Sequence, residues 1–589
     1  MGGLSGTAEY QAMKVSDYIV HFLVQQRVGH VFEVSGGMIT HLLDSCCRLG
    51  GPQVISMRHE QAAGFAAEAC ARMTGVPGVA LATSGPGATN LLTAIGSCFF
   101  DSTPAVFITG QVNRNELKGQ RAVRQSGFQE TDIVAIARPI TKAAWLIESP
   151  EDVPAMLARA FATALGGRPG PVLVDIPMDV QRATVSAAEP QPEPAQAGAT
   201  AIDPALAADI EQVLASLHGA RRPLLLVGGG LRCARAADIF RKLVSQLGVP
   251  VVNSLMAVDA LPSNEPLRVG MIGTYGNRWA NLAMGASDWL LVLGSRLDIR
   301  QTGSDVAAFK RGRTIFQVDV DAGEMNQRVP GCRAICSDLK LFLAGMLARL
   351  GDQDRGRWAQ WCAEIAELHE RWPDTAETQG APGINPNAFM QALSQSSARA
   401  SAFAVDVGQH QMWAAQSLRL GPAQRFLTSG GMGSMGFALP AAVGVAFACP
   451  ATPVVVVAGD GGFQHNIHEL QTITHHRLPI KMVVINNNCH GMVRQFQQSY
   501  FESRFQSTVW GYSAPDFAKV AAAYDIPGFT VAAESDIPGA LASLWRDPAA
   551  PALLQVMIEE STPIFPKIAF GRPFTEMEPQ AKPIDMEGT

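Results

Sequence analysis

The sequence predicts an α/β protein built from three doubly wound parallel-sheet domains. Short apolar runs alternate with longer helical patterns along the chain, and strands that alternate with helices form parallel sheets covered on both faces. The chain has 589 residues, more than one hydrophobic core usually supports, which also predicts several domains. The predicted strands are HVFEV (30–34), GVALATS (78–84), AVFITG (105–110), PVLVDIP (171–177), PLLLVGGG (223–230), WLLVLGS (289–295), TIFQVDV (314–320), PVVVVAGDG (453–461) and IKMVVINN (480–487).

Two breaks in this alternation divide the chain. The segment AAEPQPEPAQAGATAI (187–202) is rich in Pro, Ala, Gln and Glu, a composition typical of a linker. A charged, helical segment over 352–378 is followed by QGAPGINP, which indicates a second boundary. We therefore expect domains at 10–186, 200–345 and 380–565, followed by a polar tail.

Composition narrows the class of protein. Hydrophobic residues make up 47% and charged residues 17%, as in ordinary globular proteins. The net charge is 46 − 52 = −6 and no long basic run occurs, which argues against nucleic-acid binding. Ten scattered cysteines without CxxC or Cys/His spacing predict reduced thiols, neither a zinc site nor a disulfide framework.

No membrane segment is expected. The start of the chain lacks the basic residues and apolar core of a signal peptide, so we expect a cytoplasmic protein. The most apolar stretch, 437–458, contains three prolines and divides into a predicted helix (438–448) and a predicted buried strand (453–458).

Polar residues follow two of the predicted strands. Asp460, within Gly459-Asp460-Gly461, follows VVVVA, and Asn487 follows KMVVI. Ligands of doubly wound folds bind at the carboxyl edge of the sheet, where these side chains would meet. Carboxylate and amide oxygens suit Mg²⁺, and glycines let the backbone approach a diphosphate. Taken alone, the glycine-flanked aspartate also fits a tight strand-to-helix turn.

At this spacing the two motifs form the thiamine-diphosphate signature, and other motifs extend the likeness along nearly the whole chain. They are RHEQAA (58–63), LATSGPGATNLLTAI (81–95), FITGQV (107–112), FQETDIV (128–134), RPGPVLVDIP (168–177), SGGMGSMGFALPAA (429–442), GDGGFQHNIHEL (459–470) and NNNCHGMVRQFQ (486–497). With them the chain resembles the acetohydroxyacid (acetolactate) synthase group. The resemblance implies an enzyme that decarboxylates a 2-keto acid, pyruvate, and joins the two-carbon unit to a carbonyl acceptor.

The resemblance also implies the roles of individual residues. Glu60 hydrogen-bonds the aminopyrimidine N1′, the Gly433 carbonyl accepts from the 4′-amino group, and Met435 props the bent cofactor. Without the surrounding match, Glu60 would read as a surface glutamate and Met435 as a core methionine. Phe128 and Gln129, from FQETDIV, complete the catalytic set that the resemblance implies.

The diphosphate end of the cofactor is assigned in the same way. The metal ligands implied are Asp460, Asn487 and the backbone carbonyl of Cys489, whose thiol is excluded because Mg²⁺ prefers oxygen. The residues implied to contact the cofactor here are Gly459, Gly461, Gly462, Gln409 and His410. In similar enzymes the first domain of one subunit holds the pyrimidine and the third domain of its partner holds the diphosphate, which implies a homodimer or homotetramer.

The middle domain resembles a flavin-binding domain. Its GSRLDIR segment (294–300) looks like the GxRxDDR segment that contacts flavin in acetohydroxyacid synthases, so FAD without a redox role is implied. Ile299 in place of the second acid, and TYG (274–276) in place of MHG, depart from that pattern. Glycine-rich strand ends alone more often mark turns. The contacts expected are Gly229, Gly230, Arg296, Asp298, Arg300 and Asp319.

Further departures bear on the acceptor, whose pocket is expected at Phe496, Met492 and Gly37. Biosynthetic relatives carry Trp where this chain has Phe496, and YPGGA where it has VSGGM (34–38). The tail IAFGRPFTEMEP (568–579) resembles thiamine enzymes of surface-polysaccharide sugar clusters, notably the yersiniose-type pyruvate carboligase. We expect an acceptor larger than pyruvate, a ketone or keto-sugar. Acetolactate synthesis is the alternative, and the combined presence of Glu60, Asp460 and Asn487 argues against a non-catalytic homologue.

Overall fold

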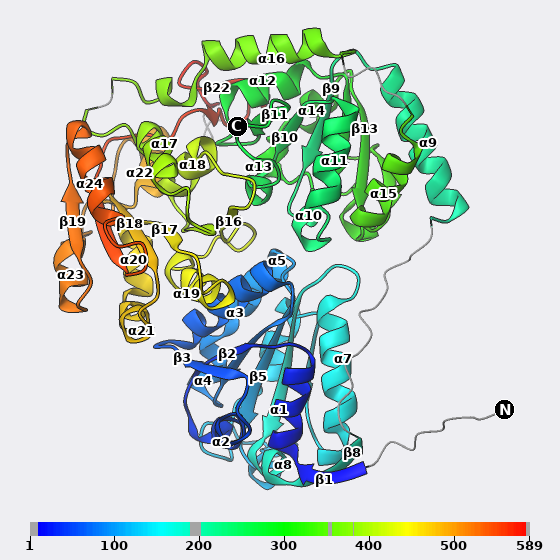
Figure 1. Cartoon of the computed structure of the whole chain (residues 1–589), viewed down its shortest axis with the longest axis vertical. Coiled ribbons are helices and arrows are strands. Elements are labelled where there is room, and N and C mark those ends of the chain that lie inside the picture. The colour runs from blue at the N-terminus through cyan, green and yellow to red at the C-terminus, as the bar shows by residue number, and fades with distance from the viewer. Residues whose placement is uncertain (1–9, 189–201, 352–355, 381, 585–589) are drawn as a thin grey trace. The chain divides into compact units, whose positions relative to one another are not determined.

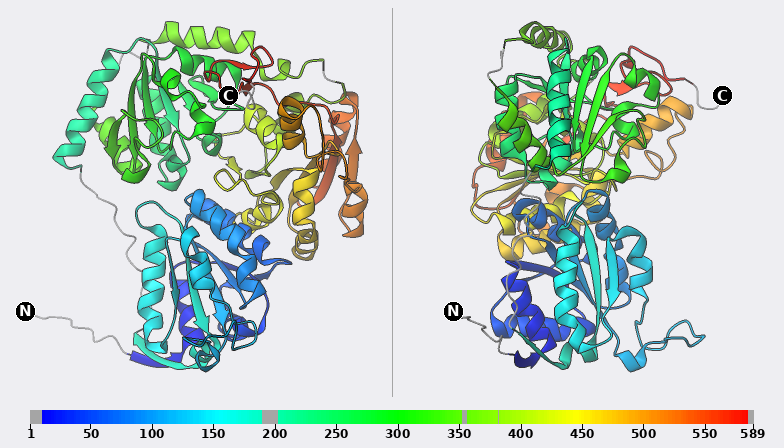
Figure 2. Two further views of the ribbon diagram at one scale, coloured as in Figure 1. Left: turned by 180° about the vertical axis from the view of Figure 1, so that it is seen from behind. Right: turned by 90° about the vertical axis from the view of Figure 1, so that its right-hand side faces the viewer.

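The structure is a computed structural model that describes residues 10–188, 202–351, 356–380 and 382–584. These residues form three six-stranded parallel sheets whose two faces are covered by helices (Figures 1 and 2). Two short antiparallel pairs join β1 (Tyr10–Lys14) to β8 (Thr184–Ala188) and β21 (Lys567–Ile568) to β22 (Met577–Glu578). The predicted α/β class is confirmed. Most of the predicted linker over 187–202 lies outside the described residues.

The first large sheet has the strand order β3-β2-β4-β5-β7-β6. Every residue of β4, β5 and β7 is buried, because helices cover both faces and such strands need continuous apolar runs. The strands are β2 (His30–Val34), β3 (Gln53–Ser56), β4 (Gly78–Ala82), β5 (Ala105–Gln111), β6 (Ala143–Leu146) and β7 (Pro171–Pro177). The longer helices connecting them are α1 (Val15–Gln25), α2 (Thr40–Leu49), α3 (Glu60–Thr74), α5 (Leu92–Phe100) and α7 (Val153–Leu165).

The third sheet repeats this order as β16-β15-β17-β18-β20-β19. Its strands are β15 (Ala402–Val405), β16 (Arg425–Leu427), β17 (Val454–Gly459), β18 (Ile480–Asn486), β19 (Gly528–Val531) and β20 (Ala552–Met557). In both sheets the strand order reverses beside the first parallel strand along the chain, between β2 and β4 in the first sheet and between β15 and β17 in the third. Doubly wound folds bind ligands at this switch point. The elements that leave the carboxyl edge here are α18 (Gln409–Ser417), α20 (Asp460–His465) and α22 (Gly491–Tyr500).

The middle sheet has a different order, β11-β10-β9-β12-β13-β14. Numbered along the chain this is 3-2-1-4-5-6, the order of dinucleotide-binding folds, with its switch point between β9 and β12. The strands are β9 (Pro223–Val227), β10 (Val251–Asn253), β11 (Arg268–Met271), β12 (Trp289–Leu293), β13 (Thr314–Asp319) and β14 (Arg333–Cys336). The charged segment predicted after this domain contains α16 (Ala359–Arg371).

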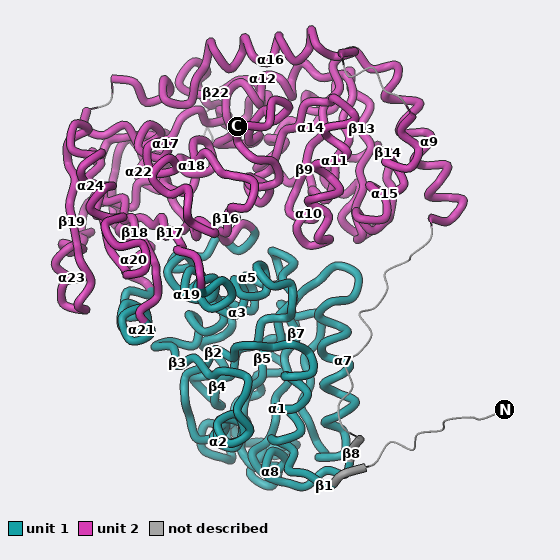
Figure 3. The backbone as a smooth tube through the Cα atoms, in the orientation of Figure 1, with its two compact units in different colours: residues 1–197, 431–450, 466–476 teal, residues 198–430, 451–465, 477–589 magenta. Residues whose placement is uncertain are grey.

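The chain forms two compact units, coloured separately in Figure 3. The first unit takes residues 431–450 and 466–476 from the region of the third sheet. Residues 438–448 form the predicted helix, α19 (Ala438–Ala448), which packs on α3. A Cβ added at Gly444 would lie 2.0 Å from the Ala66 carbonyl oxygen, so the two helices approach closely because residue 444 is glycine.

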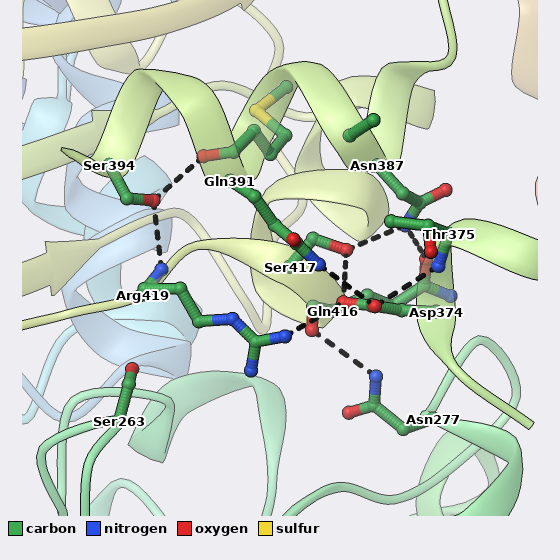
Figure 4. Close-up of polar contacts among 12 residues, drawn as sticks. Ser263, Asn277, Asp374, Thr375, Asn387, Gln391, Ser394, Gln416, Ser417 and Arg419 are labelled. Carbon is green, nitrogen blue, oxygen red and sulfur yellow. Dashed lines mark hydrogen bonds and ion pairs between the residues drawn. The ribbon is translucent and has the colours of Figure 1, made fainter. Parts of the chain in front are cut away.

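A polar network fixes the far end of α18 within the second unit (Figure 4). The Ser417 hydroxyl donates to Asp374 Oδ2 at 2.7 Å, and Gln391 Nε2 donates to Asp374 Oδ1 at 3.0 Å. Asn387 Nδ2 donates to Ser417 Oγ at 2.8 Å. Asn277, from the middle domain, donates to the Gln416 carbonyl at 3.2 Å. Because α18 begins at Gln409, this network anchors a helix whose first residues lie at the switch point of the third sheet.

All ten cysteines are free thiols. No helix among the described residues is both long enough and apolar enough to cross a membrane.

Candidate functional site

Asp460 begins α20 directly after β17, at the switch point of the third sheet. Its carboxyl accepts backbone hydrogen bonds from Gly461 and from Asn488, which follows the neighbouring strand β18. The Tyr512 hydroxyl also hydrogen-bonds this carboxyl. The parallel sheet therefore brings the two halves of the predicted motif together at one edge.

The Asp460 carboxyl is suited to holding a cation. It is only 3% exposed, and its Oδ2 is buried without a hydrogen-bond partner among the described residues. Burial raises the pKa of Asp460 to about 6, since the charged form loses its hydration. No cluster of three or more His, Cys, Asp or Glu side chains able to hold a metal occurs in the described residues. A cation at Asp460 would take its other ligands from amide and carbonyl oxygens, which suits Mg²⁺.

Asn487 and Cys489 lie beside Asp460, after β18. Asn487 Nδ2 donates to Gln409 Oε1 at 2.9 Å, and the Cys489 amide donates to Asn487 Oδ1 at 3.4 Å. The Cys489 thiol donates to the Glu560 carbonyl at 3.8 Å, and burial raises the pKa of this thiol to about 12. A protonated thiol is a poor ligand, which agrees with an oxygen-only metal site.

Glycines and a neutral histidine shape the same edge. His410 Nε2 accepts the Gly459 amide at 3.1 Å, and burial lowers the pKa of His410 to about 3. A Cβ added at Gly459 would lie 2.8 Å from His410 Nδ1, and one at Gly462 would lie 2.5 Å from Asp406 Oδ1. The predicted diphosphate contacts Gly459, Gly461, Gly462, Gln409 and His410 thus gather where β15 and β17 end.

Glu60 is the first residue of α3, in the first unit, and is 9% exposed. Asn90 Nδ2 donates to Glu60 Oε2 at 2.9 Å. A Cβ added at Gly87 would lie 3.3 Å from Glu60 Oε1, so the turn after β4 also borders this carboxyl. Among the described residues the Glu60 carboxyl has one neutral side-chain donor, and this donor together with burial distinguishes Glu60 from a solvated surface glutamate.

Three other predicted residues lie near the same turn. Gly37 begins a short 3-10 helix, residues 37–39, in which the Met38 amide donates to Thr83 Oγ1 at 3.2 Å. Gln129 has a φ of +65° and lies where a Cβ on Gly85 would contact it at 3.0 Å. Phe128, by contrast, is 80% exposed and points away from the core. The structure brings Gly37, Glu60 and Gln129 to the end of β4.

Gly433 and Met435 lie in the segment 431–437, which leads into α19. Gly433 has a φ of +67° and Gly436 a φ of +83°, left-handed conformations that favour glycine. Asn466 Nδ2 donates to the Gly436 carbonyl at 2.7 Å and to Gln61 Oε1 at 3.3 Å. One buried amide therefore connects this segment to the residue that follows Glu60.

The residues predicted to contact flavin lie at or after the ends of strands β9, β12 and β13 of the middle sheet, whose switch point lies between β9 and β12. A Cβ added at Gly230 would lie 2.7 Å from Gly294 Cα, so the ends of β9 and β12 touch through their backbones. Gly229 precedes this contact, while Arg296 and Asp298 follow β12. Asp319, at the end of β13, accepts the Asp321 amide at 3.0 Å. The topology and these glycines fit a nucleotide.

Asp298 also has a structural role that sequence reasoning did not foresee. It caps α13 (Ile299–Thr302): Oδ1 accepts the Arg300 amide at 3.0 Å and Oδ2 accepts Gln301 Nε2 at 2.7 Å. Arg300 itself is exposed. A polar contact from Asp298 to flavin would use the remaining lone pairs of an already bonded carboxyl.

Two of the three predicted acceptor residues, Met492 and Phe496, lie about one helical turn apart on α22. Met492 packs against the core of the third domain, while Phe496 is 40% exposed. The Phe496 ring lies 4.8 Å from Tyr500 and 5.7 Å from Phe501, measured between centroids. Gly37, the third predicted acceptor residue, belongs to the first unit, whereas Met492 and Phe496 belong to the second.

Sequence reasoning missed two residues: Tyr512, which hydrogen-bonds Asp460, and Asn90, which hydrogen-bonds Glu60. Tyr512 lies more than fifty residues beyond Asp460 in an irregular segment, and no spacing rule connects the two. Asn90 is part of the LATSGPGATNLLTAI motif, and its place at the end of α4 (Pro86–Asn90) gave the only available signal.

Comparison with known families gives three matches that follow the three sheets. Residues 13–136 match the family described as thiamine pyrophosphate enzyme, N-terminal TPP binding domain. Residues 210–346 match the central domain of thiamine pyrophosphate enzymes, and residues 406–556 match their C-terminal TPP binding domain.

Curated relatives align with nearly the whole chain. Acetolactate synthase isozyme 2 large subunit of Escherichia coli (strain K12) is 36% identical over 96% of this chain and 99% of its own length. Acetolactate synthase 2, chloroplastic, of Nicotiana tabacum is 35% identical over 98% of this chain and 86% of its own. Acetolactate synthase large subunit of Parasynechococcus marenigrum (strain WH8102) is 36% identical, with 98% and 92% covered.

These likenesses agree with the cofactors expected from the sequence. The chain is a thiamine-diphosphate-dependent carboligase, and its cofactors are thiamine diphosphate, Mg²⁺ and FAD. The residues that hold them remain predictions, which the buried Asp460 oxygen and the two switch points fit. By its domains and its near full-length relatives, the chain belongs to the acetolactate synthase group of the thiamine pyrophosphate enzyme family.

Proposed function

We propose that the protein condenses two molecules of pyruvate to 2-acetolactate with release of one CO₂. The observation that carries this proposal is the near full-length likeness to proteins named acetolactate synthase. In this reaction the bond between the carboxylate and the carbonyl carbon of one pyruvate breaks. The remaining two-carbon unit forms a bond to the carbonyl carbon of the second, and one proton is taken up.

We place the metal and the diphosphate at the carboxyl edge of the third sheet. Asp460, Asn487 and the carbonyl of Cys489 would supply oxygen ligands to Mg²⁺, with Asp460 the only charged ligand. Its buried Oδ2, which has no hydrogen-bond partner in the described part of the chain, supports this assignment, since buried charges are otherwise paired. The amide of Gln409 would hold Asn487 in its ligating rotamer.

We place proton handling at Glu60. A buried carboxyl with one neutral donor can share a proton with a ring nitrogen, and so favour the tautomer that activates the cofactor. When bound, thiamine diphosphate supplies a nucleophilic carbon and an electron sink for decarboxylation. The Gly433 carbonyl and the Met435 side chain would orient the pyrimidine, and the carbonyl can point outward because Gly433 takes a left-handed conformation.

We place FAD at the switch point of the middle sheet and assign it no redox step. The contact of Gly230 with Gly294 supports this placement, because it leaves the two strand ends without side chains. We further propose an active homodimer or homotetramer, as the resemblance implies, in which the first domain of one subunit and the third domain of its partner hold the two ends of the cofactor.

A larger acceptor is the second candidate. The relatives favour pyruvate as the acceptor. Phe496 favours a wider pocket, because the resemblance leads us to expect the larger Trp at this position. Its 40% exposure on α22 keeps this candidate open to test, since a half-exposed ring can border a pocket. A ketone or keto-sugar would gain apolar contact there that pyruvate is too small to make.

Mass analysis of products separates the candidates. The purified holoenzyme is incubated with pyruvate alone and with pyruvate plus ketones of increasing size. Acetolactate formation that added ketones do not divert supports the first candidate, and preferential ligation to a larger ketone supports the second. Absence of CO₂ release from pyruvate would overturn both.

Two aromatic variants refine this test. If Phe496 borders the acceptor, Phe496→Trp lowers ligation to large ketones and spares acetolactate formation. Phe501→Trp is the matched control, because Phe501 is 39% exposed in the same ring cluster and has no proposed role. Equal loss of both products in Phe496→Trp would show that the ring only packs this surface.

A further inference from the structure

A buried ionic cluster lies beneath the segment 431–437 in the first unit. Arg72, on α3, donates through Nη2 to Asp101 Oδ2 at 2.8 Å and also to Glu68 Oε1. Its Nε donates to Thr103 Oγ1 at 3.1 Å. The side chains of Glu68, Arg72 and Asp101 are 0%, 12% and 2% exposed.

Asp101 connects this cluster to the start of the segment. Its Oδ1 accepts the Gly431 amide at 2.7 Å, while Oδ2 accepts from Arg72. The approach needs glycine: a Cβ at position 431 would lie 2.6 Å from Phe100 Cβ and 3.1 Å from Asp101 Oδ1. Gly431 itself is exposed, but the Asp101 side chain is only 2% exposed, so a charge-assisted bond from a buried carboxylate fixes the position of that peptide.

Arg72 supports the other end of the segment. Its guanidinium lies 5.6 Å from the centroid of the Phe437 ring, the residue just before α19. Phe437 is fully buried and meets Phe65 of α3 edge to face, with 5.4 Å between the ring centroids. This separation lies within the usual range of about 4.5 to 7 Å for aromatic pairs. One arginine on α3 therefore braces a seven-residue segment at its last residue directly, and at its first residue through Asp101.

We propose that Asp101 and Arg72 are positioning residues for the cofactor-binding segment 431–437. They hold both ends of a loop whose two left-handed glycines would otherwise allow it several conformations. This inference rests on the proposed roles of Gly433 and Met435, which lie between the two fixed ends. Neither Asp101 nor Arg72 is placed in contact with the reacting atoms.

The effect expected from losing the brace is a misplaced pyrimidine. A shift of about 1 Å in a reacting group costs about 10²-fold in rate even when the altered residue is remote. Asp101→Asn replaces the carboxylate by an amide that cannot accept from both Gly431 and Arg72 through two oxygens. Gly431→Ala moves the segment by steric conflict and leaves the ionic cluster chemically intact.

Two readouts on the full-length holoenzyme test the proposal. The first is amide hydrogen exchange of the peptide that contains 431–437. The second is the rate at which bound thiamine diphosphate exchanges its C2 proton in deuterated water without pyruvate. Both variants are expected to lose protection of the peptide and to slow C2 exchange about 10²-fold. With pyruvate, kcat should fall by a similar factor while KM changes little.

Matched controls exist within the same unit. Asp179 accepts the Arg114 backbone amide at 3.0 Å and Arg114 Nε at 2.8 Å. These are the same two kinds of donor that Asp101 has, a backbone amide and a guanidinium, but Asp179 lies far from the segment 431–437 in sequence. Gly29→Ala adds a methyl group that would have no atom of the described residues within 4 Å. Asp179→Asn and Gly29→Ala should leave both readouts as in the wild type.

The outcomes separate this proposal from the proposed function. Unchanged peptide protection, or lost protection with unchanged C2 exchange, would overturn the positioning role. If Asp101→Asn does not fold, Gly431→Ala decides on the same readouts. A wild-type protein that exchanges the C2 proton yet releases no CO₂ from pyruvate would refute the proposed function and leave the positioning result standing.

Discussion

Asn487 Nδ2 donates to Gln409 Oε1 at 2.9 Å, which joins the end of β18 to the start of α18 across the switch point of the third sheet. The bond fixes the rotamer of Asn487, whose Oδ1 accepts the Cys489 backbone amide at 3.4 Å. A Cβ added at Gly491 would lie 1.9 Å from Gln409 Oε1, so the loop after β18 closes over this pair only with glycine there. The predicted metal ligands are thus held by partners from three strand ends.

Glu60→Gln should keep the fold and cofactor binding but slow C2 deprotonation. Loss of a proton-handling group costs about 10²–10⁴-fold in rate. Asn90→Ala should cost only about fivefold, because a neutral hydrogen bond contributes about 1 kcal/mol. Single-turnover decarboxylation of pyruvate measures both effects. Near-wild-type turnover by Glu60→Gln would remove this residue from the mechanism.

Asp460→Ala should abolish Mg²⁺-dependent binding of thiamine diphosphate, since it removes the only charged ligand proposed. Calorimetric titration with the cofactor, with and without Mg²⁺, measures the loss. Asp536→Ala is the control, because Asp536 is exposed in the same domain and bonds only the Ser535 hydroxyl in the contacts described. Binding that survives in Asp460→Ala, or wild-type activity after exhaustive chelation, would contradict the assignment.

Asp175 should make the stability of the protein depend on pH. It is 1% exposed in β7 and accepts bonds from Thr109 at 2.7 Å and Gln111 at 2.9 Å. Burial raises its pKa from 3.8 to about 7. The folded state therefore keeps a proton that the unfolded state loses, so the stabilisation is complete below pH 3.8 and is lost as pH rises to about 7.

Melting temperatures measure this dependence. The Tm of the wild type should fall relative to that of Asp175→Asn as pH rises from about 5 to about 7. The corresponding loss in the free energy of unfolding is up to about 1.4 kcal/mol per pH unit. The difference should level off at higher pH. A difference in Tm that stays constant across this range would show that Asp175 does not take up a proton on folding.

Gly230→Ala should release FAD from a folded protein. The added methyl group would lie 2.7 Å from Gly294 Cα and would force apart the ends of β9 and β12. Gly219→Ala is the control in the same domain, since its nearest contact would be 3.5 Å from the Ser216 carbonyl. Flavin absorbance per chain after purification measures the result. Full flavin content in Gly230→Ala, or none in the wild type, would place FAD elsewhere or nowhere.

The central strands could be predicted from sequence because burial on both faces demands uninterrupted apolar runs. β17 and β18 are buried at every residue, and both stand out as VVVVA and KMVVI. β3, an edge strand of sequence QVIS, has one buried residue and two exposed ones, so it carries no such signal. The strand orders could not be predicted, because order depends on crossovers that local patterns do not encode.

The site could be predicted where a residue type and its place after a strand agree, as for Asp460 and Asn487. Tyr512 and the Asp298 cap could not, because each depends on a contact formed only in the folded chain. The assignment of α19 to the first unit was equally inaccessible. Its sequence predicted a buried helix correctly but not the partner that buries it.

The packing of α3 against α19 also means that the first unit cannot complete its folding until α19 has been synthesised. Gly444 of α19 meets the Ala66 carbonyl of α3, a contact that spans 444 − 66 = 378 residues. At typical rates of translation the ribosome needs roughly 20 to 80 s to make that stretch. Throughout this interval the apolar surface of α3 that α19 later covers is without its partner. The nascent first domain therefore exposes this apolar face of α3 to solvent until α19 has been made. We expect a chaperone that protects the emerging chain to bind there.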